Sequence, residues 1–375
     1  MKNLIGLTKE QLTQELINIG EKPFRAAQIW NWIYVRGVQN FSAMSNISKA
    51  TQEVLTKNFT LARPAIFKDL LASDGTRKWL VKFADGNQVE AVFIPEETRG
   101  TLCISSQVGC TLACKFCHTG TQTLVRNLEA SEIVGQIMIA KDLLDDWKKI
   151  GVGDMAASPS RQKITNVVFM GMGEPFYNYE NVAATAKILN DAAGLSLSSR
   201  RITISTSGLV PEILRMSKEL KTALAISLHA ANDMLRTSIM AINKKYPLDE
   251  LMKACKIYNN ENPGQKVTFE YVLLRDINDR DEHARELISL INKYNLNAKI
   301  NLIPFNPWMS CGYERSSDER IAQFQKILKN SDLVAPIRKT RGDDVMAACG
   351  QLKSDSQRVS KRQKMGFKSD EDIPT

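Results

Sequence analysis

The sequence lacks any long uncharged apolar run. No stretch of its 375 residues approaches the roughly 20 apolar residues of a membrane-spanning helix. The first residues, MKNLIGLTKEQ, also lack the apolar run and cleavage site of a secretory signal. These absences exclude a helical membrane protein and predict a cytoplasmic protein without a membrane partner. The composition, 43% hydrophobic and 24% charged residues, is ordinary for a globular chain.

The sequence also lacks an even number of cysteines. Its seven cysteines are spread along the chain, and in a reducing compartment such usage favours metal binding or catalysis over a disulfide framework. Three of them, Cys110, Cys114 and Cys117, lie close together in VGCTLACKFCHTG. A structural zinc site takes four protein ligands, so this group of thiols lacks a fourth member.

Positive charge is in excess, with a net charge of +9. An excess of this size points to a polyanionic partner, and nucleic acid is the first candidate. Many globular proteins are basic for no specific reason, so charge alone leaves the two interpretations about equal.

Residues 1–60 read as a helical accessory domain. Thr8 and Gln11 have the spacing of a capping box. The stretch EKPFRAAQIWNWIYVRG interleaves basic and aromatic residues, which suits RNA phosphates and stacked bases. Trp30 and Tyr34 lie four residues apart, one helical turn, so we favour a small core for these two rings.

Residues 61–98 change to a β-type period. Turns at Asp74–Gly75 and Asp85–Gly86 separate alternating segments, which predicts a three-stranded meander. Glu90 falls on the third strand, on the same face as neighbouring apolar residues. A carboxylate on such a face is either solvent-facing at an edge or held inward for a purpose, and from this pattern alone we expect Glu90 to be a solvent-facing edge residue.

The region 99–352 alternates six apolar β-type runs with helical patterns, which predicts an α/β fold with a parallel sheet covered by helices, either barrel-like or doubly wound. The runs are TLCISS, ITNVVFMG, RITISTSG, TALAISLHA, KVTFEYVLL and AKINLIPFN. In a barrel the site lies at the carboxyl ends of the strands. Residues 147–163 read as a surface insertion. The tail 353–375 is polar and expected to be disordered, although its basic run RVSKRQK could touch RNA.

The three thiols have the chemistry of an iron–sulfur site. A four-iron cluster normally takes four thiolates, so three leave one iron open for a chelating ligand, as catalytic zinc leaves a position for substrate. The spacing CxxxCxxC, with an aromatic residue before the last cysteine, resembles radical S-adenosylmethionine (SAM) enzymes. FMGMGEP resembles the glycine-rich segment of that superfamily, which contacts the SAM amino group. The alternative is structural zinc completed by Cys103 or His118.

Four further stretches resemble one family of radical SAM enzymes. TLCISSQVGCTLACKFC, VVFMGMGEP, NLIPFNP and RGDDVMAACGQL together are similar to the RlmN family of RNA adenine C2-methyltransferases. The resemblance covers residues 1–352 and implies a partial (β/α)6 barrel with a helical N-terminal domain and a β-meander linker. The sequence departs from the family pattern at His118, where we expect a small hydroxyl residue, and in the longer insertion.

The resemblance also implies a mechanism and its residues. Cys349 takes a methyl group from one SAM. A second SAM, at a 4Fe-4S cluster held by the three loop cysteines, gives the 5′-deoxyadenosyl radical that abstracts a hydrogen from this methyl group. The methylene radical adds to C2 of adenine, Glu90 removes the C2 proton, and Cys103 attacks Cys349 to form a disulfide and release the product. The implied SAM contacts are Gly173, Glu174, Ser205, Ser227, Leu228, His229 and Asn306.

The family's substrates are adenine 2503 of 23S rRNA and adenine 37 of tRNA, both unpaired, as radical attack on a base edge requires. We expect a monomer served by a flavodoxin or ferredoxin. A Cfr-type enzyme, which methylates C8 of the same rRNA adenine, shares the cluster and the cysteine pair, so these motifs do not separate the two activities. A zinc-stabilised RNA-binding protein without catalysis is the more distant alternative.

Overall fold

The computed structural model describes residues 1–147, 163–309 and 311–356. The predicted insertion at 147–163 therefore lies almost entirely outside the described residues. The same holds for the tail after residue 356, including its basic run. Among the described residues, no helix has the length and apolar character needed to cross a bilayer.

The N-terminal region is helical, as predicted. The Thr8 hydroxyl accepts from the Gln11 amide and the Gln11 side chain accepts from the Thr8 amide, so the capping box is present. Trp30 and Tyr34 are buried with ring centroids 4.4 Å apart, which confirms that these rings build a core. The elements are β1 (Lys2–Asn3), α1 (Lys9–Asn18), α2 (Arg25–Tyr34), η1 (Phe41–Ala43), α3 (Lys49–Asn58) and β2 (Phe59–Thr60).

One nine-stranded sheet carries the rest of the fold, in the order β13-β12-β11-β10-β9-β6-β5-β4-β3. The predicted meander forms its antiparallel part, since β3, β4, β5 and β6 pair in antiparallel succession. Gly75 and Gly86 have positive φ values of 82° and 86° in the two predicted turns. The meander strands are β3 (Ala65–Leu71), β4 (Arg77–Lys82) and β5 (Gln88–Pro95).

The six predicted apolar runs form the parallel part of this sheet. The sheet stays open, so the barrel is partial, and residues 334–338 bind along its β13 edge, where the Ile300 amide donates to the Val334 carbonyl at 2.8 Å. The strands are β6 (Gly100–Cys103), β9 (Asn166–Phe169), β10 (Ile202–Thr206), β11 (Ala223–Ser227), β12 (Val267–Leu273) and β13 (Ala298–Pro304).

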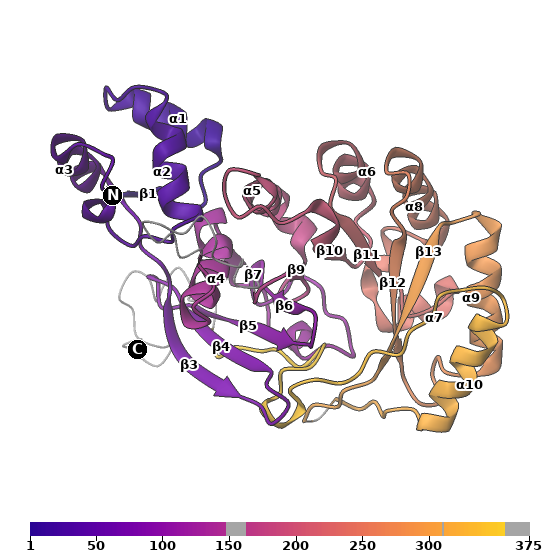
Figure 1. Ribbon diagram of the computed structural model, residues 1–375. Coiled ribbons are helices and arrows are strands. Elements are labelled where there is room, and N and C mark those ends of the chain that lie inside the picture. Colours follow the sequence, from indigo (N-terminus) through magenta and orange to yellow (C-terminus); the bar gives the residue numbers. More distant parts are fainter. Residues whose placement is uncertain (148–162, 310, 357–375) are drawn as a thin grey trace, which may run out of the picture.

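Helices cover the outer side of this curved sheet, and α1–α3 stand together at the end opposite α9 and α10 (Figure 1). The covering helices are α4 (Ala130–Leu143), α5 (Tyr179–Asn190), α6 (Val210–Glu219), α8 (Leu248–Glu261), α9 (Asp281–Lys293) and α10 (Asp318–Lys329). The short helix α7 (Asp233–Ile239) lies instead at the carboxyl ends of β10 and β11. The short elements are β7 (Gln107–Val108), β8 (Arg126–Asn127), η2 (His118–Thr121), η3 (Pro175–Asn178), η4 (Ser199–Arg201), η5 (Ala241–Lys244) and η6 (Asp343–Val345).

A largely buried ion pair links the N-terminal region to α4. Arg63 pairs with Asp142 and also donates from Nη2 to the Gly37 carbonyl at 2.7 Å. The Trp147 indole donates to the other Asp142 oxygen at 2.6 Å. Since the Arg63 side chain is almost fully buried, removing either charge would leave the other unpaired in a dry site.

Candidate active site

The cysteine loop lies between the paired strands β7 and β8, at the carboxyl side of β6. The Cys110 amide donates to the Gln122 carbonyl at 3.1 Å, and the Cys117 amide to the Cys114 carbonyl at 3.1 Å. At Gly120, a Cβ atom would come within 2.7 Å of the Cys114 carbonyl, so the close approach requires glycine. The loop therefore holds its three half-buried thiols on a folded backbone.

Burial governs the charge of these thiols. It raises the pKa of Cys110 to about 12 and raises the pKa of Cys114 and Cys117 as well. Negative charge on Cys117 and Glu174 raises the pKa of Cys110 and of Cys114 further. Thiols in such a site lose their protons when a cation binds, so the donor set fits an iron centre.

The three thiols lie near one another. The charges of Cys117 and Cys110 raise the pKa of Cys114, so the loop brings its thiols within reach of each other's charge. Three thiolates are one fewer than a four-iron cluster normally takes, which would leave one iron open for a chelating ligand.

The glycine-rich segment after β9 lies against the loop that follows β6. The Gly171 amide donates to the Ile104 carbonyl at 3.0 Å, and the Met172 amide to Ser105 Oγ at 2.8 Å. Gly173 has φ of 97°, and a Cβ atom there would stand 2.5 Å from the Gln107 Cβ. Only glycine fits this position, so backbone groups line this part of the site.

Glu174 is buried beside the cysteine loop. Its carboxylate accepts from the Phe176 amide at 3.1 Å and from the Ser207 amide at 2.8 Å. Burial raises the pKa of this carboxyl, while these amide donors oppose the rise. The two amide bonds fix Glu174 in place, next to thiols that would carry a cluster.

The remaining predicted SAM contacts gather at the ends of the neighbouring strands. Ser205 and Ser227 lie half-buried on β10 and β11, and Leu228 follows buried. Asn306 follows β13 and donates from Nδ2 to the Cys349 carbonyl at 3.3 Å. These residues lie near the carboxyl ends of parallel strands, as the sequence predicts, but their contact with SAM stays a prediction.

His229 is held by its backbone and by its ring. It has φ of 60°, and Nδ1 accepts from the Val272 amide at 3.0 Å. Burial lowers the pKa of this imidazole to about 3, so the ring is neutral. Its edge meets the Phe116 ring, with centroids 4.6 Å apart. The aromatic residue before Cys117 therefore joins the cysteine loop to the end of β11.

Cys103 and Cys349 are 246 positions apart in the sequence, yet the charge of Cys349 acts on Cys103 in the fold. Burial raises the pKa of Cys103 to about 12, and negative charge on Cys349 raises it further. Cys349 is an exposed residue, and the groups packed around its thiol raise the pKa of that thiol. Both are free thiols near the cysteine loop. Their redox roles stay predictions.

Two charged residues beside this pair are missing from the sequence predictions. The Arg338 guanidinium lowers the pKa of both thiols, and the charge of Cys349 is the largest cause of a raised pKa at Arg338 itself. Glu270, on β12, is buried and accepts from Asn301 Nδ2 at 2.9 Å. Neither residue belongs to a motif, and only the fold brings them near the thiols.

The expectation of a solvent-facing Glu90 is wrong. Strand β5 lies inside the sheet between β4 and β6, and Glu90 is only 7% exposed. Its Oε1 is 2.8 Å from Lys78 Nζ, and its Oε2 accepts from the Lys353 amide at 3.0 Å. Burial raises the pKa of the Glu90 carboxyl, and Lys78 opposes the rise. A buried carboxylate with a matched cation suits a proton acceptor.

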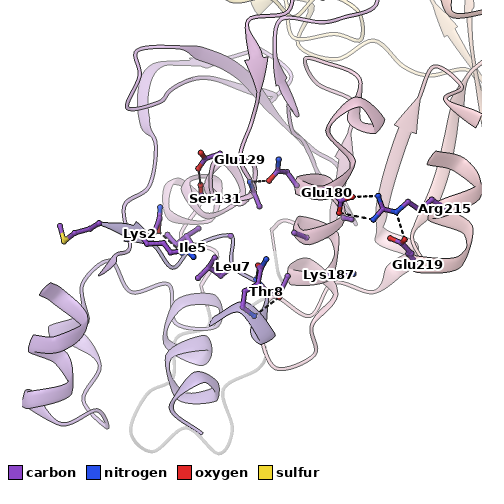
Figure 2. A pocket seen from close by; sticks show the side chains of 18 residues that line it. Lys2, Ile5, Leu7, Thr8, Glu129, Ser131, Glu180, Lys187, Arg215 and Glu219 are labelled. Atoms are coloured by element: carbon purple, nitrogen blue, oxygen red, sulfur yellow. Dashed lines mark hydrogen bonds and ion pairs between the residues drawn. The ribbon is translucent and has the colours of Figure 1, made fainter. Parts of the chain in front are cut away.

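A separate cavity of about 850 Å³ lies between the N-terminal segment and helices α4, α5 and α6 (Figure 2). Arg215 pairs there with Glu180 and Glu219, and Lys2 pairs with Glu15 nearby. None of the predicted site residues is among those that line it. The cavity and the thiol site are therefore built from different residues.

Comparisons with known proteins agree with this site. Residues 2–61 match the family model of the ribosomal RNA large subunit methyltransferase N-terminal domain, and residues 104–288 match the radical SAM superfamily. The dual-specificity RNA methyltransferase RlmN of Sinorhizobium medicae is 51% identical over 98% of this chain and 91% of its own length. The same enzyme of Zymomonas mobilis is 49% identical over 97% of this chain and 92% of its own.

A solved structure extends the comparison to the fold. The crystal structure of a radical SAM methyltransferase from Sphaerobacter thermophilus has a TM-score of 0.85 and 40% identity to this chain. The match covers 94% of this chain and 99% of the other. Its extent includes the N-terminal helices, the meander and the partial barrel.

Proposed function

The chain belongs to the RlmN family of radical SAM RNA methyltransferases, and on this basis we propose that it methylates C2 of adenine in 23S rRNA and in tRNA. Its cofactors are a 4Fe-4S cluster and SAM, with two SAM molecules in each cycle. When bound, the cluster and SAM supply a 5′-deoxyadenosyl radical. The RNA positions that we propose are adenine 2503 of 23S rRNA and adenine 37 of tRNA.

The observation that supports this proposal is the place of Cys349: its charge raises the pKa of Cys103, and the next residue, Gly350, accepts from the His118 amide of the cysteine loop. C2 of adenine lies between two ring nitrogens, so it is electron-poor and does not attack the methyl group of SAM as a nucleophile. A carbon carried by one thiol can be added to the ring, and a second thiol can release it. Two thiols near one cluster loop provide both functions.

Each residue has a defined task in this scheme. The Cys349 thiolate attacks the methyl carbon of SAM, and S-adenosylhomocysteine leaves with the bonding electron pair. Once the carbon is joined to C2, the adduct is a radical that must give up one electron, which the cluster would accept, and Glu90 accepts the C2 proton. The Cys103 thiolate then attacks the Cys349 sulfur. The sulfur–sulfur bond forms as the carbon–sulfur bond breaks, and the released carbon takes up a proton to become the methyl group.

The partners follow from this chemistry. The cluster needs an electron donor and the disulfide needs reduction, for which we propose a flavodoxin or ferredoxin and a thiol reductant. The net charge of +9 supports phosphate-led binding of RNA. We propose that the enzyme works as a monomer in the cytoplasm.

An anaerobic assay tests the proposal. The reconstituted protein is incubated with SAM, reductant and either 23S rRNA or tRNA, and nucleosides are separated by mass spectrometry against 2-methyladenosine and 8-methyladenosine standards. We expect 2-methyladenosine from both RNAs. 8-Methyladenosine alone would replace the proposal with Cfr-type chemistry, and absence of iron–sulfur absorbance would reject it.

The variant Cys103→Ala isolates the release step. It retains Cys349 and the cluster loop, so the carbon–carbon bond can form, but no thiol can attack the Cys349 sulfur. We expect RNA covalently attached to the protein on a denaturing gel and almost no free product. Free methylated RNA at the parent's yield would contradict the release by Cys103. Cys255→Ala, a buried thiol on α8 outside the site, is the matched control.

A further inference from the structure

Two aromatic rings from distant segments are stacked at the thiol site. The His118 and Trp308 ring centroids are 4.7 Å apart, and their planes differ by only 9°. His118 directly follows Cys117 in the cysteine loop, whereas Trp308 lies in the loop after β13. The Trp308 indole also donates to the Phe116 carbonyl at 3.1 Å. The loop after β13 therefore contacts the cysteine loop in two ways, through the stacked Trp308 ring and through the hydrogen bond of its indole.

The same end of the cysteine loop binds the segment that carries Cys349. The His118 amide donates to the Gly350 carbonyl at 2.7 Å, and Nδ1 of its ring lies 3.1 Å from the Gln351 carbonyl. A carbonyl only accepts, so Nδ1 carries the proton of this bond. The Thr119 hydroxyl donates to the Leu352 carbonyl at 2.5 Å. Three successive carbonyls after Cys349 are thus bound by two adjacent residues.

The loop after β13 binds the Cys349 segment from its other side. Gln351 Nε2 donates to the Pro307 carbonyl at 3.0 Å, and Asn306 Nδ2 donates to the Cys349 carbonyl at 3.3 Å. Three segments therefore contact one another pairwise: the cysteine loop, the loop after β13 and the Cys349 segment. On the side of the cysteine loop, His118 contacts both of the other two segments.

We propose that the stacked pair His118–Trp308 is a positioning element that fixes the distance between the cysteine loop and Cys349. The inference rests on the proposed roles of that loop and of Cys349. Hydrogen abstraction requires the methyl group on Cys349 to stay within contact distance of the radical, so small displacements uncouple SAM cleavage from methylation. A stacked ring pair resists such displacement because sliding or tilting loses ring contact.

The small hydroxyl residue expected at position 118 shows by contrast what the His118 ring adds. A small hydroxyl residue, which the family resemblance predicts at position 118, has no ring to cover Trp308. It would keep only the backbone bond to Gly350. The ring of His118 adds both the stacked face and the bond to Gln351, and separate substitutions can remove each of these.

Two variants separate the ring face from the hydrogen bond. His118→Phe keeps a flat ring against Trp308 but loses the donor, whereas His118→Asn keeps a donor near the Nδ1 position but loses the ring. His118→Ala removes both. Met309→Ala is the matched control, because Met309 is next to Trp308 and 87% exposed. Thermal unfolding of each variant verifies that it folds, and Trp308→Phe against Trp308→Ala repeats the comparison from the other ring.

The first readout needs neither RNA nor turnover. Hydrogen–deuterium exchange of peptides covering residues 343–352 should accelerate about fivefold in His118→Ala. This is the change in rate expected when the segment loses the stabilisation of one stacked ring pair of average strength. The second readout is the number of 5′-deoxyadenosine molecules formed for each methyl group transferred to RNA. This ratio should rise about fivefold in His118→Ala and return to the parent value in His118→Phe.

The outcomes distinguish a failure of the positioning role from a failure of the proposed function. Unchanged exchange and an unchanged ratio in His118→Ala overturn the positioning role. Recovery in His118→Asn but not in His118→Phe overturns the role of the stacked face. If the parent protein carries no methyl group on Cys349 and methylates no RNA, the proposed function fails, while the exchange measurement still decides whether the rings hold this segment.

Discussion

At the scale of single residues, burial sets the charge of the groups around the site. His229 is neutral because its ring is buried and Nδ1 accepts from the Val272 amide. Glu90 keeps a cation at hydrogen-bond distance because its carboxylate lies inside the sheet. The acid–base behaviour of both side chains therefore differs from that of the same groups in water.

The lowered pKa of His229 makes stability depend on pH. In the unfolded chain the imidazole takes up a proton near pH 6.5, whereas in the fold it does so only near pH 3. Stability from this group is therefore complete above pH 6.5 and falls as the pH drops from there toward 3, by up to about 1.4 kcal/mol for each pH unit.

The variant His229→Asn tests this dependence. Asparagine tolerates positive φ and can present an oxygen to the Val272 amide, but it has no titrating ring. Between pH 7 and pH 5, urea unfolding should show the parent losing about 2 kcal/mol more than the variant. Equal losses of unfolding free energy in the two proteins would contradict the inference that the His229 imidazole is buried and neutral.

The variant Glu90→Gln tests the proposed base. Glutamine keeps the shape of the side chain and can accept from the Lys353 amide, but it does not take up a proton. We expect release of methylated RNA to slow by about 100-fold, with the covalent RNA–protein adduct accumulating on denaturing gels. Glu96→Gln, a surface residue paired with Arg99, is the control. Normal release from Glu90→Gln would remove this carboxylate from the mechanism.

At the scale of secondary structure, one arginine joins α7 to the ends of two strands. Arg236 has no exposed surface, and its guanidinium donates to the carbonyls of Ser207, Ser227 and Leu228. Nη1 donates to Asn243 Oδ1 at 2.8 Å. Backbone carbonyls at the end of a parallel strand need such donors when no water reaches them. Arg236 therefore shapes the ends of β10 and β11, where Ser205 and Ser227 lie.

Replacing this arginine should loosen both strand ends. In Arg236→Met the side chain still fills space, but three buried carbonyls lose their donor. We expect a loss of about 3 kcal/mol in the free energy of unfolding and a weaker affinity for SAM. Met234→Ala, on the same helix and 85% exposed, should change neither quantity. Chemical unfolding and equilibrium binding measure the two effects, and parent-like values would exclude this support.

The elements of the barrel could be predicted because parallel strands are buried on both faces and read as continuous apolar runs. The meander and the capping box of α1 were also visible in turn and cap residues. Glu90 was misplaced because a strand pattern does not reveal which strands will flank it. Arg236, Arg338 and Glu270 were missed in the sequence analysis. The role of each depends on contacts between elements that are distant in the sequence, and no local motif marks such contacts.

At the scale of the whole molecule, exposed positive charge at one end of the protein is available to bind RNA. Lys22 and Arg36 flank α2 and are exposed, and among the described residues neither has a carboxylate partner. The Arg36 guanidinium lies 4.2 Å from the Trp32 ring centroid, an arrangement that leaves its outer side for a phosphate. These helices stand away from α10 at the opposite end (Figure 1).

Salt dependence of binding measures these contacts. The double variant Lys22→Ala/Arg36→Ala should lower RNA affinity and reduce the slope of log affinity against log salt by about 1 to 2 units, since each lost phosphate contact removes about 0.7 to 0.9. Lys326→Ala/Lys329→Ala on α10 loses the same charge at the far end and should leave the slope as it is. Equal slopes in all three proteins would place the RNA elsewhere.

The closure of the cysteine loop by the segment after Cys349 has a consequence for biosynthesis. His118 and Thr119 bind partners 233 residues farther along the chain. At a translation rate of roughly 5 to 20 residues per second, these partners leave the ribosome about 10 to 50 s after the loop. The three thiols therefore stay uncovered during this interval, and the loop is closed only when the segment after Cys349 has emerged.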